Sequence, residues 1–239
     1  MEFKEGYDGL DKFVKQAIDR TKGAMQNFGY DWIVVGGMAV HLQIINKIYE
    51  SIKIDNEIKS IEDVVEKAIK NLVRTTGILR KTDDLDIVVR ADYDKLKCDL
   101  VAYYNQTRGL SFKGFEEAGI RKAIKYTIPK EMQRDRREPL VVTYNASYDL
   151  DINDTDVLNM PELGISEVRI PKVEYLVALK LYQGRPKDLM DVNCLLRYYI
   201  KDFDEEYFEK CLEKVSGGKE YENAIEKYKE IKEEITKVY

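Results

Sequence analysis

Aspartates at the head of an apolar run are the residues of this 239-residue sequence that point most directly to chemistry. In "RKTDDLDIVV", Asp84 and Asp86 alternate with apolar residues typical of a buried strand. Side chains alternate between the two faces of a strand, so Asp84 and Asp86 are expected on one face and their apolar neighbours on the other. Because an unpaired buried charge is costly, carboxylates in such a strand call for a partner.

A second acidic pair, Asp149 and Asp151 in "YDLDIND", alternates with apolar residues in the same way. If the two predicted strands are neighbours, the four carboxylates converge and repel one another. A divalent cation, Mg²⁺ or Mn²⁺, relieves this repulsion, and a site with few carboxylates keeps positions open for substrate phosphates. The aspartates therefore predict a metal site that also takes phosphate.

Gly36 and Gly37 stand between the apolar segment "DWIVV" and a predicted helix. Glycines let the backbone approach a ligand closely, and the N-terminal amides of a helix favour an anion. A strand, a Gly-Gly turn, a helix and an Asp-x-Asp strand together outline a phosphate and metal site.

The elements that must position these residues form a mixed α/β front half and a helical back half. Hydrophobic periodicity and turn residues predict helices over 8–28, 38–49, 50–75 and 92–106, and strands over 31–35, 85–89, 122–129, 139–144 and 148–154. Beyond residue 155 only "SEVRI" is strand-like. Helices are predicted over 171–182, 186–200, 203–215 and 221–239, the first two opening with Pro171 and Pro186 at the first helical position.

Composition narrows the class of protein. The hydrophobic fraction of 44% excludes wholesale disorder, and the net charge of -5 gives no overall attraction to nucleic acid. The three cysteines form no CxxC pair, which argues against a zinc knuckle or a disulfide framework. No apolar run is long enough for a membrane helix, and the N-terminus lacks a signal-peptide pattern, so we expect a cytoplasmic protein without a membrane partner.

Three ordered segments resemble the nucleotidyltransferase (polymerase beta-like) superfamily. They are Gly36-Gly37, then Arg80-x-Thr82-x-Asp84-x-Asp86, then Lys180-Leu181 with Arg185-x-Lys187-Asp188-x-x-Asp191. The last segment resembles the branch that contains the AbiEii-type toxins of type IV toxin–antitoxin systems. The resemblance implies a nucleotidyltransferase core over residues 1–155 and a helical region over 156–239 that completes the cleft.

The resemblance also implies a reaction and a role for each matched residue. A nucleoside monophosphate would pass from an NTP to an acceptor hydroxyl on RNA or protein, and an antitoxin protein is an implied partner. Asp84 and Asp86 would hold Mg²⁺ or Mn²⁺, and Asp149 fits the third carboxylate best, with Asp151 as the competing choice. The matched residues implied to contact or line the nucleotide site are Gly36, Gly37, Arg80, Thr82, Lys180, Arg185, Lys187 and Asp188.

One departure and several alternatives stay open. Residues 45–75 are interpreted as a helical insertion where the family has a short connection, which leaves the acceptor undefined. Lys180 could instead extend to solvent along an apolar helix, and Asp188 could brace Arg185. At the level of function, the alternatives are a small-molecule nucleotidyltransferase of the kind that modifies antibiotics, and a non-catalytic nucleotide-binding or antitoxin-binding module.

Overall fold

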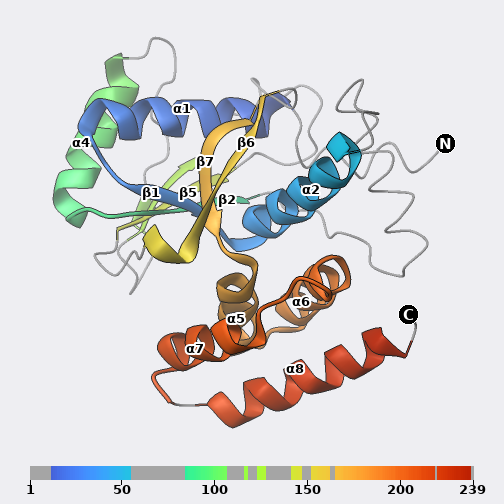
Figure 1. The fold of residues 1–239 in the computed structure, drawn as a ribbon. Coiled ribbons are helices and arrows are strands. Elements are labelled where there is room, and N and C mark those ends of the chain that lie inside the picture. The colour runs from blue at the N-terminus through green and yellow to red at the C-terminus, as the bar shows by residue number, and fades with distance from the viewer. Residues whose placement is uncertain are drawn as a thin grey trace. The chain divides into compact units, whose positions relative to one another are not determined.

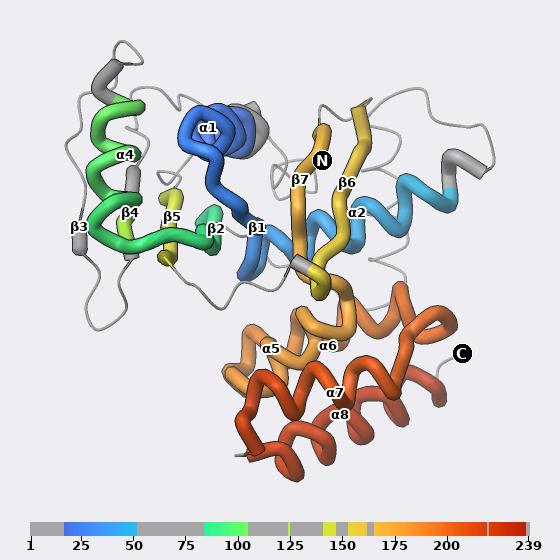
Figure 2. Tube along the Cα trace, turned by 60° about the vertical axis from the view of Figure 1, so that its left-hand side comes forward, coloured from blue at the N-terminus to red at the C-terminus, as the bar shows by residue number. Residues whose placement is uncertain are grey.

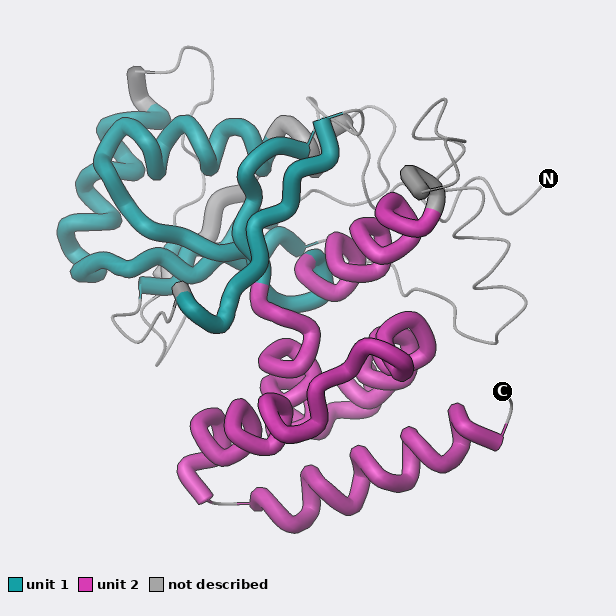
Figure 3. The backbone as a smooth tube through the Cα atoms, viewed as in Figure 1, with its two compact units in different colours: residues 1–38, 81–170 teal, residues 39–80, 171–239 magenta. Residues whose placement is uncertain are grey.

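The protein divides into two compact units, which Figure 3 shows in different colours. The first comprises Met1–Met38 and Lys81–Ile170, and the second Ala39–Arg80 and Pro171–Tyr239. The computed structural model describes residues 12–54, 84–106, 116–117, 123–127, 141–146, 152–161, 165–218 and 220–237. The functional division into regions 1–155 and 156–239 stays a prediction.

The predicted fold class is confirmed: a small mixed sheet occupies the front of the chain, and helices occupy its C-terminal end (Figure 1). The helices are α1 (Lys12–Phe28), α2 (Gly36–Ile54), α4 (Tyr93–Gln106), α5 (Val173–Gln183), α6 (Pro186–Tyr199), α7 (Glu205–Ser216) and α8 (Tyr221–Thr236), with a short 3₁₀ helix, η4 (Ile152–Asp154). The strands are β1 (Trp32–Val35), β2 (Asp84–Val89), β3 (Glu116–Glu117), β4 (Ala123–Thr127), β5 (Val141–Ala146), β6 (Thr155–Met160) and β7 (Ile165–Pro171).

The described strands of the main sheet run in the order β1-β2-β5-β4-β3, which can be followed in Figure 2. β2 pairs antiparallel with β1 and parallel with β5, and β4 pairs antiparallel with β5. The predicted pairing of the strands near 122–129 and 139–144 is thus confirmed. β2 lies inside the sheet with a neighbour on each side, so its residues are held in register from both directions.

One face of β2 and β5 forms the core of the first unit. Leu85, Ile87 and Val89 are buried, and the buried Tyr144 of β5 lies on their side of the sheet. The Tyr144 hydroxyl lies 3.0 Å from Thr21 Oγ1 of α1 and 2.6 Å from Tyr104 Oη of α4. These buried polar contacts join both helices to this face and leave the Asp84 and Asp86 face as the opposite one.

Three local predictions are wrong. Residues 152–154 form the 3₁₀ helix η4 and not the end of a strand, while residues 148–151 lie outside the described residues. β6 was not predicted, because Asp156 and Asn159 disfavour strand structure; β7 pairs with it in a two-stranded sheet. Pro171 ends β7, and α5 begins after Lys172. Pro186, in contrast, does open α6.

A buried polar network ties α2 to the other helices within the second unit. Gln43 Nε2 donates to the carbonyl of Pro171 at 2.7 Å, and the Tyr199 hydroxyl lies 2.8 Å from Gln43 Oε1. Lys47 pairs with Asp202 at 2.7 Å. Residues 45–54, predicted as the start of an insertion, continue α2, and 55–75 lie outside the described residues. Among the described helices, none has the length and apolar content to cross a bilayer.

Candidate functional site

The Asp-x-Asp segment forms β2 as predicted, and its alternation places the two aspartates together. Asp84 is exposed and Asp86 is half-buried, whereas Leu85, Ile87 and Val89 are buried. Because alternate residues of a strand share a face, both carboxylates lie on the face opposite the Tyr144 core. Asp86 pairs with Val35 on one side and with Thr143 on the other.

The Gly-Gly turn lies directly against Asp86. Val35 is the last residue of β1, and the chain turns into α2 at Gly36, which has a φ of 69°. A Cβ on Gly36 would lie 2.5 Å from Asp86 Oδ2, closer than real Cβ contacts. Glycine is required here twice, for the left-handed backbone and for the approach of the carboxylate. The structure thus brings together Gly36 at the start of α2 and the Asp-x-Asp strand.

Other predicted residues of this site are beyond what the structure describes. Arg80, Thr82, Asp149 and Asp151 all fall outside the described residues, so the choice between Asp149 and Asp151 stays a prediction. Within the described ranges, no group of three or more His, Cys, Asp or Glu side chains is arranged to hold a metal. The described donor set therefore consists of the two carboxylates of β2.

This donor set fits Mg²⁺ or Mn²⁺ better than a softer metal. Two carboxylates on one strand face supply hard oxygen donors and leave most coordination positions for water and phosphate. Because Gly36 has no side chain, its backbone can lie against Asp86. A Cβ at position 36 would occupy that space. Asp84 and Asp86 are the residues that would hold the cation.

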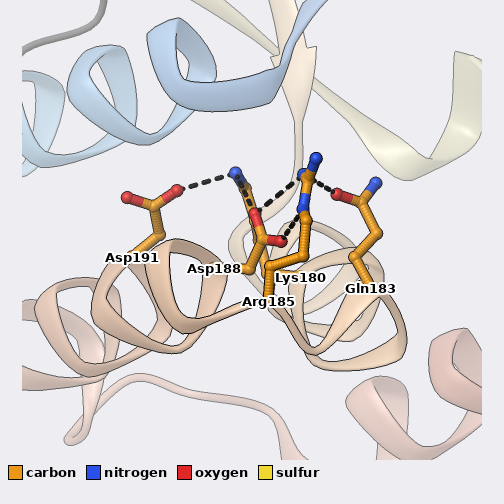
Figure 4. A network of polar contacts seen from close by, with 5 residues as sticks. All are labelled: Lys180, Gln183, Arg185, Asp188 and Asp191. Carbon is orange, nitrogen blue, oxygen red and sulfur yellow. Dashed lines mark hydrogen bonds and ion pairs between the residues drawn. The ribbon is translucent and has the colours of Figure 1, made fainter.

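Lys180, predicted to lie near the triphosphate, is paired with two carboxylates in the second unit (Figure 4). Its Nζ donates to Asp191 Oδ2 at 2.7 Å and to Asp188 Oδ1 at 3.1 Å. All three side chains are almost fully buried. Gly184 caps α5 in the left-handed conformation and Pro186 opens α6, and this sharp turn folds the carboxylates of α6 back onto Lys180.

Arg185 extends this network toward solvent. Its guanidinium donates from Nε and Nη2 to both oxygens of Asp188, and Nη2 also donates to Gln183. Burial alone would raise the pKa of Asp188, but the hydrogen bonds and charges of Arg185 and Lys180 outweigh it and lower that pKa. Asp188 therefore braces Arg185, as one of the alternatives from the sequence had it. Lys187 is exposed. Contacts of Lys180, Arg185, Lys187 and Asp188 with a nucleotide stay predictions.

Sequence reasoning did not assign two features of these clusters. Gln183 is a partner of Arg185, and Asp191 is a closer partner of Lys180 than Asp188 is. The signal for Asp191 was present, because residues Asp188 and Asp191 lie three apart and share a face of α6. Which positively charged side chain these two aspartates face depends on the turn at Gly184.

Comparison with known proteins assigns the chain to no family. No protein-family model matches the chain, and no curated protein matches it. Among solved structures, an antigenic nucleotidyltransferase-like protein from Paracoccidioides brasiliensis is 15% identical, with a TM-score of 0.45 over 92% of this chain and 94% of its own. JHP933 from Helicobacter pylori is also 15% identical, with a TM-score of 0.34 over 65% of this chain and 76% of its own. Likeness at this level is too weak to establish a shared fold or activity.

Proposed function

We propose that this protein is a metal-dependent nucleotidyltransferase of the polymerase beta-like superfamily. The observation that carries the proposal is the approach of Gly36 to Asp86, with Asp84 on the same face of β2. The order of the motifs in the sequence predicted this arrangement of a glycine turn, a helix start and paired carboxylates. The same combination suits a triphosphate bound through a divalent cation.

In the proposed reaction the acceptor oxygen forms a bond to the α-phosphorus of an NTP, and the bond from that phosphorus to the bridging oxygen of pyrophosphate breaks. When bound, Mg²⁺ neutralises charge on the phosphates. Asp84 and Asp86 would hold that ion, and Gly36 and Gly37 leave room for the phosphate chain beside the first amides of α2. The acceptor proton passes to a carboxylate, for which Asp149 and Asp151 are the candidates. Positioning of the two oxygens in line supplies most of the rate.

The acceptor and biological role rest on the sequence. The basic segments "IRKAIKY" and "KEMQRDRRE" favour RNA or protein as acceptor over a small cationic molecule. The resemblance of residues 180–191 to AbiEii-type toxins supports a toxin role with an antitoxin partner.

Transfer of label tests the proposal. The protein is incubated with Mg²⁺, total RNA or cell lysate, and each α-labelled NTP in turn. We expect label on RNA or protein with one or more NTPs, and none from the double variant Asp84→Asn plus Asp86→Asn. Transfer by that double variant at the wild-type rate would contradict the proposed site.

A further inference from the structure

A groove with a volume of about 470 Å³ is lined by α6 and α8, two helices of the second unit (Figure 1). Its α6 side is largely apolar, with Leu189, Met190 and Cys194 among the lining residues. Met190 is 53% exposed. A single exposed apolar side chain is ordinary, but apolar side chains gathered in a groove with a charged rim are typical of a protein interaction site.

The charged residues that line this groove are balanced in sign. Arg197 of α6 and Lys227 of α8 supply two positive charges, and Glu230 and Glu234 of α8 supply two negative ones. Nucleic-acid binding depends on an excess of positive charge, which this groove lacks. Small-molecule sites are mostly apolar and carry few charges. The balance of charges therefore favours a protein surface that also presents both signs.

The side of α8 that lines the groove is complementary to itself. α8 is anchored within the unit by its buried residues Ala224, Tyr228 and Ile235. Lys227, Ile231 and Glu234 follow one another at spacings of four and three residues, so they share a face, with Ile231 between the two opposite charges. When a second copy of this face is laid antiparallel, each Lys227 meets Glu234 of the other copy, and the two Ile231 side chains meet between them.

We propose that the groove between α6 and α8 is the interface of a homodimer, in which a second copy of the chain docks by two-fold symmetry with its α8 antiparallel to the first. A two-fold interface uses the same patch on both copies, so each contact occurs twice. Lys227 pairs with Glu234 of the partner subunit at both ends, and Met190 and Ile231 of the two copies form the apolar centre. The apolar centre supplies affinity, and the charge pairs select the partner and its direction. This inference concerns assembly and does not depend on nucleotidyl transfer.

Sedimentation velocity of the full chain at a series of concentrations tests for the dimer. Lys227→Glu and Glu234→Lys should each raise the dimer dissociation constant at least about tenfold, because each places like charges opposite one another twice. Met190→Gln should also weaken the dimer, because it removes an exposed apolar side chain from the centre. Lys229→Glu is the matched control and should dimerise like the wild type, because Lys229 is an exposed lysine of α8 outside the groove lining.

Recombination of the two charge changes tests the antiparallel pairing itself. The double variant Lys227→Glu plus Glu234→Lys faces opposite charges to each other again, so it should dimerise like the wild type. The two single variants, each impaired alone, should form a heterodimer when mixed, because together they restore opposite charges at both ends. Native mass spectrometry of the mixture distinguishes the heterodimer from either homodimer.

Three results would overturn the inference. The first is a wild type that stays monomeric at every concentration up to about 0.1 mM. The second is a dimer that Lys227→Glu and Glu234→Lys leave intact, since it would use another surface. The third is a double variant that is folded by circular dichroism and does not recover dimerisation. Because nucleotidyl transfer is measured separately, each of these results leaves the proposed function standing.

Discussion

The ammonium group of Lys180 has two carboxylates as hydrogen-bond partners, and this pairing sets what its replacement should do. Lys180, Asp188, Asp191 and Arg185 balance two positive against two negative charges around a buried centre. Removing one member of a buried ion pair leaves an uncompensated charge out of water, which is far more costly than losing an exposed pair. A structural role for Lys180 therefore exists whether or not it also contacts a nucleotide.

Lys180→Met keeps most of the side-chain volume and removes the charge. We expect it to lower the free energy of unfolding by about 3–5 kcal/mol, since Asp188 and Asp191 stay buried without Lys180. Urea denaturation followed by circular dichroism measures the change. Lys187→Met, at an exposed lysine of α6, is the control and should stay within about 0.5 kcal/mol of the wild type. Equal stability of the two variants would show that the Lys180 network contributes little.

At the scale of elements, the turn from β1 into α2 decides how close a helix start comes to the carboxylates of β2. The register fixes this, because Val35 pairs with Asp86 and the next residue already opens α2. The turn works only with a glycine at position 36, for reasons of both backbone conformation and space. The glycine that the sequence supplies at position 36 is thus the residue that the register of the sheet requires there.

Comparison of Gly36→Ala with Gly29→Ala should separate the effect of backbone conformation from the effect of space beside Asp86. Both glycines have a φ of 69°, but an added Cβ at Gly29 meets nothing within 4 Å. Each variant should lose about 1–2 kcal/mol of stability from the left-handed backbone. Only Gly36→Ala should also displace Asp86, so Mn²⁺ binding in the presence of NTP should weaken in that variant alone. Titration calorimetry measures the binding, and equal binding by both variants would mean that Asp86 does not hold the cation.

At the scale of the whole molecule, the buried carboxylate of Asp188 links the stability of the protein to pH. Arg185 and Lys180 together hold the pKa of Asp188 below its ordinary value despite burial. A group with a lowered pKa in the folded state stabilises the fold fully above its unfolded pKa, about 4 for an aspartate. That contribution disappears as the pH falls from about 4 through the lower folded-state value.

Comparison of the wild type with Asp188→Asn across pH tests this linkage. At neutral pH the wild type should be more stable, because the neutral amide cannot balance Arg185 and Lys180. The difference in unfolding free energy should shrink steadily as the pH falls below about 4. Chemical denaturation at a series of pH values measures it. A difference that does not change with pH would show that Asp188 is not ionised in the folded protein.

The sequence by itself determined the local structure and the grouping of residues along single elements. Alternation placed Asp84 and Asp86 on one face of a strand, and Pro186 marked the start of α6. These features depend on residues a few positions apart, so the pattern is sufficient to predict them. Where the local pattern was weak, as in β6, the prediction failed.

Only the tertiary structure decided which residues face each other across elements. Nothing in "PLVVTY" indicates that Thr143 lies beside Asp86, because the parallel register of β2 and β5 joins segments more than fifty residues apart. Nor does the periodicity of α5 show that Lys180 turns to Asp188 and Asp191, since that depends on the angle set at Gly184. Register and charge pairing are properties of long-range contacts, whose free energy is settled by the packing of the whole unit and not by any local preference.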